Sequence, residues 1–355
     1  MADVRVLVVD DSLTVRKRLC EILARDPSVE VVGEAADGKR AIELCRDLRP
    51  DVVTLDMMLP VMSGLAATEY VMAHFPTPIL VVSASMNRGE VYKTYEALAA
   101  GAVDVLDKPR GDEPDDDWER RFVAAVKLVA KIRVITHPRA RLPWRDRVAT
   151  PGLHPSAAPE SAVALVAVGA STGGPSAIVE VLRGLPPTFS LPLAFVLHIS
   201  AVFGPSFADW LDAQTPRRVA FARDGEPVAS ASGRVVMAPP EQHLVVRDGV
   251  FRLTRDPERH SCRPSVDVLF ESMARELGGA SAACLLTGMG RDGAAGLLQI
   301  RRAGGPTIAQ DEATSVVYGM PREAALLGAA GRVLPLGEIP AALAALDPRT
   351  RGARP

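Results

Sequence analysis

The chain has 355 residues, a length that suits two domains better than one. Its composition, 48% hydrophobic and 24% charged, is typical of a folded soluble protein, and a formal net charge of −2 argues against nucleic acid or an anionic membrane as a partner. No apolar run approaches the roughly 20 residues that span a bilayer, and the N-terminus lacks a signal-peptide pattern. The four cysteines form no CxxC pair, so we expect a cytoplasmic protein without a disulfide framework.

Short apolar runs alternate with helical patterns in the first part of the chain. Strands are predicted at 4–9, 29–35, 51–60, 79–85 and 103–109, and helices at 14–24 and 38–48. Strands that alternate with helices indicate a parallel sheet covered on both faces, which is an α/β fold.

The composition changes after this region. Residues 112–119 are acidic and turn-prone, a helix is predicted at 118–132, and 131–159 carries six Lys or Arg, one acid and five prolines. A nucleic-acid arm is one reading of this basic stretch, but a solvated linker is the better one. The sequence therefore predicts a first domain over 1–125, a linker over 126–160 and a second domain over 161–350.

A second α/β pattern begins at residue 161. Strands are predicted at 163–170, 191–198, 283–289 and 306–311, and helices at 175–185, 267–278, 293–303 and 321–330. Residues 218–256 hold short strand-like pieces broken by DG and PP, which predict a β-meander or a hairpin insertion. We thus expect two doubly wound parallel-sheet domains, the second with a β-hairpin insertion.

Polar side chains stand at the ends of the predicted strands of the first domain. Asp10 and Asp11 follow the first strand, Asp56 lies near the end of the third, Ser83 ends the fourth, and Lys108 ends the fifth. The carboxyl ends of parallel strands share one edge of the sheet, where open α/β folds place their sites. Three carboxylates there repel one another unless a divalent cation lies among them, and Mg²⁺ suits such oxygen ligands. A cation and a lysine would stabilise an incoming phosphoryl group.

The motifs VVDDS, LDMMLPVMSGL, VVSAS and DKP occur in order over the first 110 or so residues, and this region resembles the receiver domain of response regulators. The resemblance implies a flavodoxin-like fold and a histidine kinase as phosphodonor. It also implies that Asp56 is the phospho-acceptor, that Asp10 and Asp11 hold Mg²⁺ with it, and that Ser83 and Lys108 contact the phosphoryl group.

The stretch GASTGGP, residues 169–175, allows three readings. A dinucleotide loop fails because Ser171 stands where G-x-G-x-x-G needs its second glycine, and a P-loop fails because no Gly-Lys-Ser/Thr follows. The third reading is a nucleophile, since residues 169–173 match G-x-S-x-G. A serine nucleophile needs a base, and the base needs an orienting acid. His198 and Asp292 follow predicted strands of the same domain, so they are the candidates; the other histidines are less well placed.

The motifs GASTGGP, VLHIS, RPSVDVLF, LTGMGRDGA and AQDEATSVVYGMPREA also occur in order, and the second domain resembles the catalytic domain of chemotaxis protein-glutamate methylesterases. The resemblance implies a Rossmann-like domain, without a cofactor of its own, that hydrolyses glutamate methyl esters on methyl-accepting chemoreceptors and deamidates receptor glutamines. By the same resemblance Ser171 attacks the ester, His198 carries the proton, and Asp292 orients His198. The backbone N–H of Met289, with that of Thr172, would stabilise the oxyanion.

Several positions depart from these families, among them Ile199 and Ser200, which follow His198 where Met-Pro is common. Val105 stands where receivers usually carry Tyr or Phe, Leu197 precedes the catalytic histidine where Gln is common, and Cys262 stands where His is usual. A regulator that binds through a degenerate catalytic domain is therefore the alternative. A DNA-binding regulator ranks low, because no helix-turn-helix pattern or basic recognition helix is present.

Overall fold

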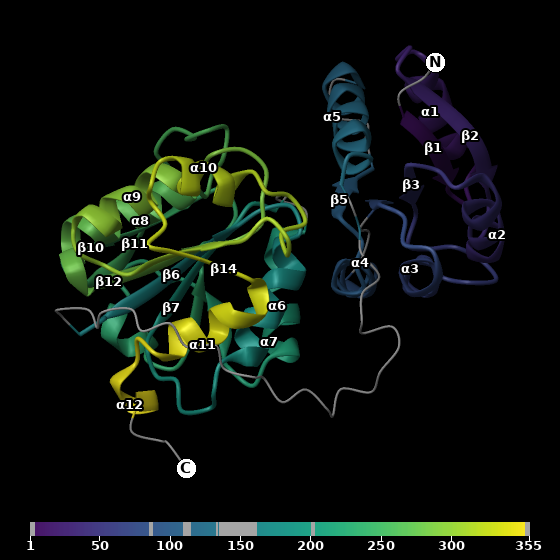
Figure 1. The fold of residues 1–355 in the computed structure, drawn as a ribbon. Helices are drawn as coiled ribbons and strands as arrows, with labels where there is room; N and C mark the ends of the chain where they lie inside the picture. The colour runs from purple at the N-terminus through teal and green to yellow at the C-terminus, as the bar shows by residue number, and fades with distance from the viewer. Residues whose placement is uncertain are drawn as a thin grey trace. The chain divides into compact units, whose positions relative to one another are not determined.

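The structure is a computed structural model that describes residues 4–84, 88–108, 115–132, 134, 162–199 and 203–351. The chain divides into two compact units, residues 1–151 and 152–355, and each is treated by itself (Figure 1). Most of the predicted linker, 126–160, lies outside the described residues.

The first unit is built on a five-stranded parallel sheet in the order β2-β1-β3-β4-β5, which is the order of the flavodoxin-like fold that the receiver resemblance implies. The strands are β1 Val4–Val9, β2 Val29–Ala35, β3 Val52–Leu55, β4 Ile79–Ser83 and β5 Asp104–Asp107. The helices are α1 Leu13–Ala24, α2 Gly38–Leu48, α3 Gly64–His74, α4 Arg88–Ala99 and α5 Asp115–Val129. The sequence did not predict α3 and α4 individually.

Local chemistry explains where these helices begin. Ser12, Asp37 and Ser63 precede α1, α2 and α3 with extended backbone, and each side chain accepts a hydrogen bond from the N–H three residues on. These caps fix where each helix begins after the loop that follows its strand.

Helix α5 continues four residues into the range predicted as linker. The rings of Trp118 and Phe122 stack with centroids 5.1 Å apart, and both are buried. Val126 and Val129 are fully buried too, so they extend this apolar face and keep the chain helical to Val129.

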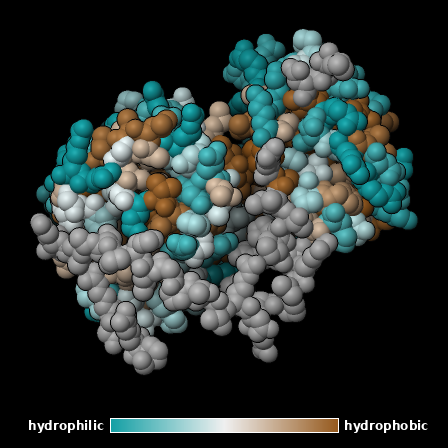
Figure 2. Space-filling view, in the orientation of Figure 1, coloured by the Kyte–Doolittle hydropathy of each residue, from teal (hydrophilic) through white to brown (hydrophobic). Residues whose placement is uncertain are grey.

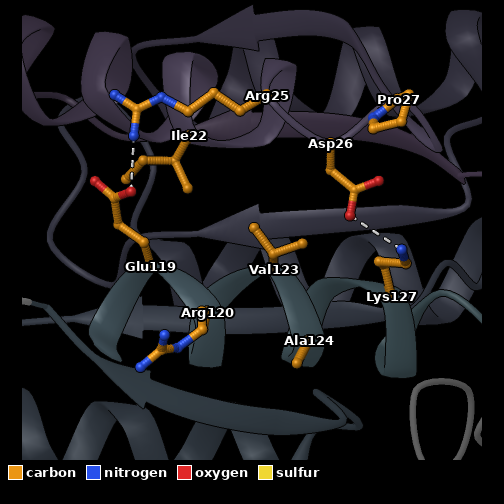
Figure 3. A pocket seen from close by; sticks show the side chains of 9 residues that line it. All are labelled: Ile22, Arg25, Asp26, Pro27, Glu119, Arg120, Val123, Ala124 and Lys127. Atoms are coloured by element: carbon orange, nitrogen blue, oxygen red, sulfur yellow. Dashed lines mark hydrogen bonds and ion pairs between the residues drawn. The ribbon is translucent and has the colours of Figure 1, made fainter. Parts of the chain in front are cut away.

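A groove lies between α1 and α5 of the first unit (Figure 3). Two ion pairs join the helices, Arg25 to Glu119 at 2.8 Å and Lys127 to Asp26 at 3.0 Å. The groove is lined by charges that largely pair with one another, and none of the candidate site residues lines it. We therefore place the chemistry of this unit at the sheet edge.

The second unit contains a seven-stranded parallel sheet in the order β14-β13-β12-β6-β7-β9-β8, which confirms the predicted α/β class. Its strands are β6 Leu165–Ala170, β7 Leu193–Leu197, β8 Val219–Phe221, β9 Val235–Met237, β12 Ser281–Leu285, β13 Thr307–Gln310 and β14 Arg332–Leu334. The antiparallel hairpin is β10 His243–Arg247 and β11 Val250–Thr254. The α-helices are α6 Gly174–Gly184, α7 Gly204–Gln214, α8 Val266–Leu277, α9 Ala294–Arg302, α10 Met320–Leu326, α11 Ile339–Ala344 and α12 Pro348–Arg351.

The helix predicted at 321–330 ends at Leu326, and β14, α7, α11 and α12 were not predicted. Two further differences concern the strands. Only β10 and β11 form the inserted hairpin, because β8 and β9 pair in parallel at the edge of the main sheet. The strand predicted at 283–289 ends at Leu285, because the chain beyond it turns to donate and accept hydrogen bonds with the loop that follows β6.

The apolar core of the second unit lies against the sheet between residues of β6, β7, β12 and helices α8 and α9. Figure 2 shows hydrophobic side chains among hydrophilic ones on the visible face of both units. No helix among the described residues is long and apolar enough to cross a bilayer.

Candidate functional site

The first unit brings its predicted acidic residues together at the carboxyl edge of the sheet. Carboxylate oxygens of Asp10, Asp11 and Asp56 lie within 4.8 Å of one another. Lys108 Nζ lies 2.7 Å from Asp10 Oδ2 and 3.0 Å from Asp56 Oδ2. Asp10 and Asp56 are buried, while Asp11 is exposed. The cluster is therefore exposed to solvent at Asp11.

Burial and charge act together on this cluster. Burial raises the pKa of Asp10 above its usual value, although the Lys108 ammonium opposes that rise. Burial lowers the pKa of Lys108, but the negative charges of Asp56 and Asp10 outweigh it and hold that pKa above its ordinary value. Lysine offsets one of the three carboxylate charges, so two remain for a divalent cation with oxygen ligands. The donor set therefore fits Mg²⁺.

Ser83 ends β4 beside this cluster. Its hydroxyl is buried and makes no hydrogen bond within the part of the chain that the structure describes. A buried hydroxyl without a hydrogen-bond partner destabilises the fold unless a bound group or a water molecule supplies that partner. Val105 pairs with Val81 between β5 and β4 and is half-buried, so an aliphatic side chain takes the position that an aromatic ring usually has in receivers.

In the second unit, Ser171 and His198 follow neighbouring strands. Ala170 of β6 is paired with Leu197 of β7, and the N–H of His198 donates to the Ala170 carbonyl at 3.0 Å. Ser171 is half-buried at the turn into α6, where Gly173 has a φ of +76°. A Cβ at Gly173 would lie 2.5 Å from Val316 Cβ, so both the backbone and the space require glycine.

His198 and Asp292 are in direct contact. His198 Nε2 lies 2.9 Å from Asp292 Oδ2, and both side chains are largely buried. The Asp292 carboxylate also accepts hydrogen bonds from the Ser265 hydroxyl and from the N–H groups of Val266 and Asp267. These donors form the N-terminus of α8, where the helix dipole favours a negative charge. The carboxylate is thus held in one orientation toward the imidazole.

The two groups shift each other's protonation. Burial lowers the pKa of His198, but the contacts with Asp292 and Cys262 outweigh burial and raise it to about 9. Burial raises the pKa of Asp292, but the contacts with His198, Asp267 and Ser265 outweigh burial and hold it below its usual range. The pair therefore favours an imidazolium beside a carboxylate.

Ser171 is the triad member that the structure does not join to the others. Its hydroxyl makes no hydrogen bond to any described residue, and His198 Nδ1 instead faces Cys262 Sγ at 3.7 Å. Because Nε2 is taken by Asp292, Nδ1 is the nitrogen that could accept a proton from Ser171. Catalytic hydrogen bonds are often long in ligand-free enzymes and shorten when the substrate binds.

The loop after β12 holds the turn at Ser171 through hydrogen bonds with Thr287. The N–H of Ser171 donates to the Thr287 carbonyl at 3.0 Å, and the Thr287 hydroxyl donates to the Thr172 carbonyl at 3.0 Å. Gln310 accepts the N–H of Thr287 through its side-chain oxygen at 2.8 Å. In the same loop Met289 is 56% exposed, and its N–H donates to no acceptor in the described chain. A free N–H is what the predicted oxyanion role of Met289 requires.

Sequence reasoning missed several residues that shape the site. The Thr287 carbonyl and hydroxyl contact the Ser171 turn, and the Ser265 hydroxyl contacts Asp292, and no motif spacing reveals these contacts. Cys262 is brought to His198 by a tight turn in which Arg259 and Cys262 pair and the residues between them have φ of +54° and +58°. Its departure from the family pattern was the only sequence signal for this contact.

Comparison with known proteins identifies the family of each unit. A model described as "Response regulator receiver domain" matches residues 6–114, and one described as "CheB methylesterase" matches residues 166–343. A protein-glutamate methylesterase/protein-glutamine glutaminase of Anaeromyxobacter dehalogenans is 45% identical over 342 residues, 96% of each chain. A protein with the same name from Geobacter metallireducens is 43% identical over 348 residues, 97% of this chain and 99% of its own.

Among solved structures, the CheB methylesterase catalytic domain of Thermotoga maritima is 35% identical, with a TM-score of 0.49, and covers 52% of this chain and 98% of its own. Because both family models match in order and the relatives align over nearly the whole length, the chain belongs to the CheB family of receiver-containing protein-glutamate methylesterase/protein-glutamine glutaminases.

Proposed function

We propose that Ser171, His198 and Asp292 hydrolyse glutamate methyl esters on methyl-accepting chemoreceptors and deamidate receptor glutamines. The observation that carries the assignment is the 2.9 Å contact between His198 and a carboxylate that α8 holds in place, with Ser171 at the adjacent strand end. Family membership supplies the reaction class, and the residue roles are inferred from position and chemistry.

The steps follow from these positions. Ser171 Oγ attacks the ester carbonyl while His198 Nδ1 takes its proton, and Asp292 stabilises the imidazolium. The carbonyl oxygen becomes an oxyanion beside the N–H of Met289, with the N–H of Thr172 as the second proposed donor. His198 returns the proton to methoxide, and methanol leaves. Water then attacks the acyl-enzyme in the same way and releases the glutamate side chain; for a glutamine substrate the leaving group is ammonia.

The first unit is proposed to regulate this chemistry. Asp56 accepts a phosphoryl group from a histidine kinase, and Asp10, Asp11 and Asp56 would hold Mg²⁺, which supplies positive charge to the transferring group. We propose that Lys108 and Ser83 contact the phosphoryl oxygens. Two observations support this: Lys108 Nζ lies 3.0 Å from Asp56 Oδ2, and the buried Ser83 hydroxyl has no hydrogen-bond partner among the described residues. The substrate and the phosphodonor both imply a cytoplasmic protein.

The experiment is a methanol-release assay on methylated receptor membranes with wild-type protein and Ser171→Ala. Removing a serine nucleophile costs on the order of 10⁶-fold in turnover, so Ser171→Ala should release no methanol above background. Equal release by the two proteins would remove Ser171 from the mechanism. No release by either protein would favour the alternative, in which the second unit only binds.

A further inference from the structure

We propose that Cys262 and His198 form a binding site for a thiophilic divalent cation such as Zn²⁺, and that the bound cation inhibits the esterase. The inference rests on the proposed role of His198 as the base. Its basis is the 3.7 Å separation of Cys262 Sγ and His198 Nδ1, the nitrogen that the proton transfer needs.

The other hydrogen bonds of these side chains leave Cys262 Sγ and His198 Nδ1 facing each other. His198 Nε2 is taken by Asp292 at 2.9 Å, and the Cys262 thiol lies 3.4 Å from the His260 carbonyl, to which it donates. In the neutral imidazole, a nitrogen lone pair and a sulfur lone pair therefore point into one space. A proton on Nδ1 fills that space in the imidazolium, and a cation can replace that proton.

The separation suits a tetrahedral metal. Zn–S bonds of about 2.3 Å and Zn–N bonds of about 2.0 Å at the tetrahedral angle place sulfur and nitrogen about 3.5 Å apart. The observed distance is 3.7 Å, so little movement is needed. Thiolate and imidazole ligands also favour zinc, whereas Mg²⁺ favours oxygen ligands.

The surroundings already resemble those of a metal-bound histidine. Such a histidine usually donates its second N–H to a carboxylate, which fixes the ring. Asp292 has this position, and its own orientation is fixed by α8. The arginines close to Cys262 in sequence are paired, Arg259 with Glu271 at 2.7 Å and Arg263 with Glu241 at 3.5 Å, which limits their repulsion of a cation.

Binding would block the reaction directly. The cation displaces the thiol proton, and the Nδ1 proton where the imidazole carries one, and both leave to solvent; no atom changes oxidation state. With Nδ1 coordinated, His198 cannot accept the Ser171 proton. Two protein ligands leave positions for water, so we expect reversible inhibition.

The test has a spectroscopic arm that does not depend on catalysis. Full-length protein with excess Mg²⁺, which occupies the carboxylate cluster, is titrated with Co²⁺, and the thiolate-to-cobalt charge-transfer band is recorded. Wild type and Ser171→Ala should both show the band at one equivalent, and Cys262→Ala and Cys262→Ser should not. Cys20→Ala is the matched control, because Cys20 is also half-buried but lies in the first unit.

The second arm measures methanol release against Zn²⁺ concentration, with each variant normalised to its own metal-free rate. Loss of a residue that only hydrogen-bonds to a metal ligand weakens metal binding about 10–100-fold. Loss of the ligand itself in Cys262→Ser should therefore raise the Zn²⁺ concentration that gives half-inhibition at least about tenfold. Equal inhibition of wild type and Cys262→Ser, or a band that persists in both Cys262 variants, would overturn the metal site. Activity that survives in Ser171→Ala would overturn the proposed function instead, and the cobalt band would still report on the site.

Discussion

His198 has to be neutral to act as a base, yet its contacts favour the charged form. With a pKa of about 9, about one imidazole in a hundred is neutral at pH 7. We therefore expect kcat/KM for methanol release to rise with pH and to level off above pH 9 or so. The same raised pKa stabilises the fold: this stability is fully present below the unfolded histidine pKa near 6.5 and is lost as pH rises through about 9.

The measurement is a pH profile of kcat/KM beside a pH series of unfolding free energies, from wild type and Asp292→Asn. The amide cannot hold the imidazolium, so the profile of Asp292→Asn should move to lower pH and its rate should fall by roughly 10⁴-fold. His198→Gln serves as the stability control and should lose the pH-dependent component. A wild-type profile centred near pH 6.5 would contradict the ion-pair interpretation of the site.

At the scale of elements, the loop after β12 holds Ser171, the proposed nucleophile, through Thr287. A Cβ on Gly288 would lie 2.8 Å from Ser171 Cβ and 2.3 Å from Met320 Sδ. Gly288→Ala should therefore push Ser171 away from His198, and a displacement of about 1 Å can cost about 10²-fold in rate. The methanol-release assay measures this loss, and circular dichroism shows whether the fold is kept.

Gly337→Ala is the matched control for that substitution. The nearest atom to a Cβ there is a Glu180 carboxylate oxygen at 4.0 Å, in the same unit. The Gly337→Ala protein should therefore release methanol at the wild-type rate. If Gly288→Ala is as active as Gly337→Ala, the loop does not set the position of Ser171.

Strand ends could be predicted from sequence better than the loops that join them. Apolar runs such as Leu165–Ala170 predict a buried strand, and the residue after each run then lies at the edge of the sheet. This reasoning placed Asp56, Ser171 and His198 at sheet edges. The contact between Thr287 and Ser171 depends on where β12 stops, and apolar residues continue past that point. Cys262 reaches His198 through a tight turn at non-glycine residues, which has no propensity signal.

At the scale of the whole molecule, phosphorylation in one unit is proposed to control hydrolysis in the other. A small phosphodonor should raise methanol release by the full-length protein, and Asp56→Asn should abolish that increase because no carboxylate accepts the phosphoryl group. The quantity compared is the ratio of release with and without phosphodonor for each protein. An increase of the same size in Asp56→Asn would show that the phosphodonor acts elsewhere.

Omission of Mg²⁺ distinguishes phosphorylation in the first unit from hydrolysis in the second. The Asp10, Asp11 and Asp56 carboxylates are where Mg²⁺ fits, whereas the proposed hydrolysis uses only protein groups and water. Without Mg²⁺ the ratio should therefore fall to one while release without phosphodonor stays the same. A fall in both would mean that the catalytic unit itself needs the metal. A ratio that is unaffected would mean that phosphoryl transfer to Asp56 proceeds without the metal, with the Lys108 ammonium 3.0 Å from the Asp56 carboxylate.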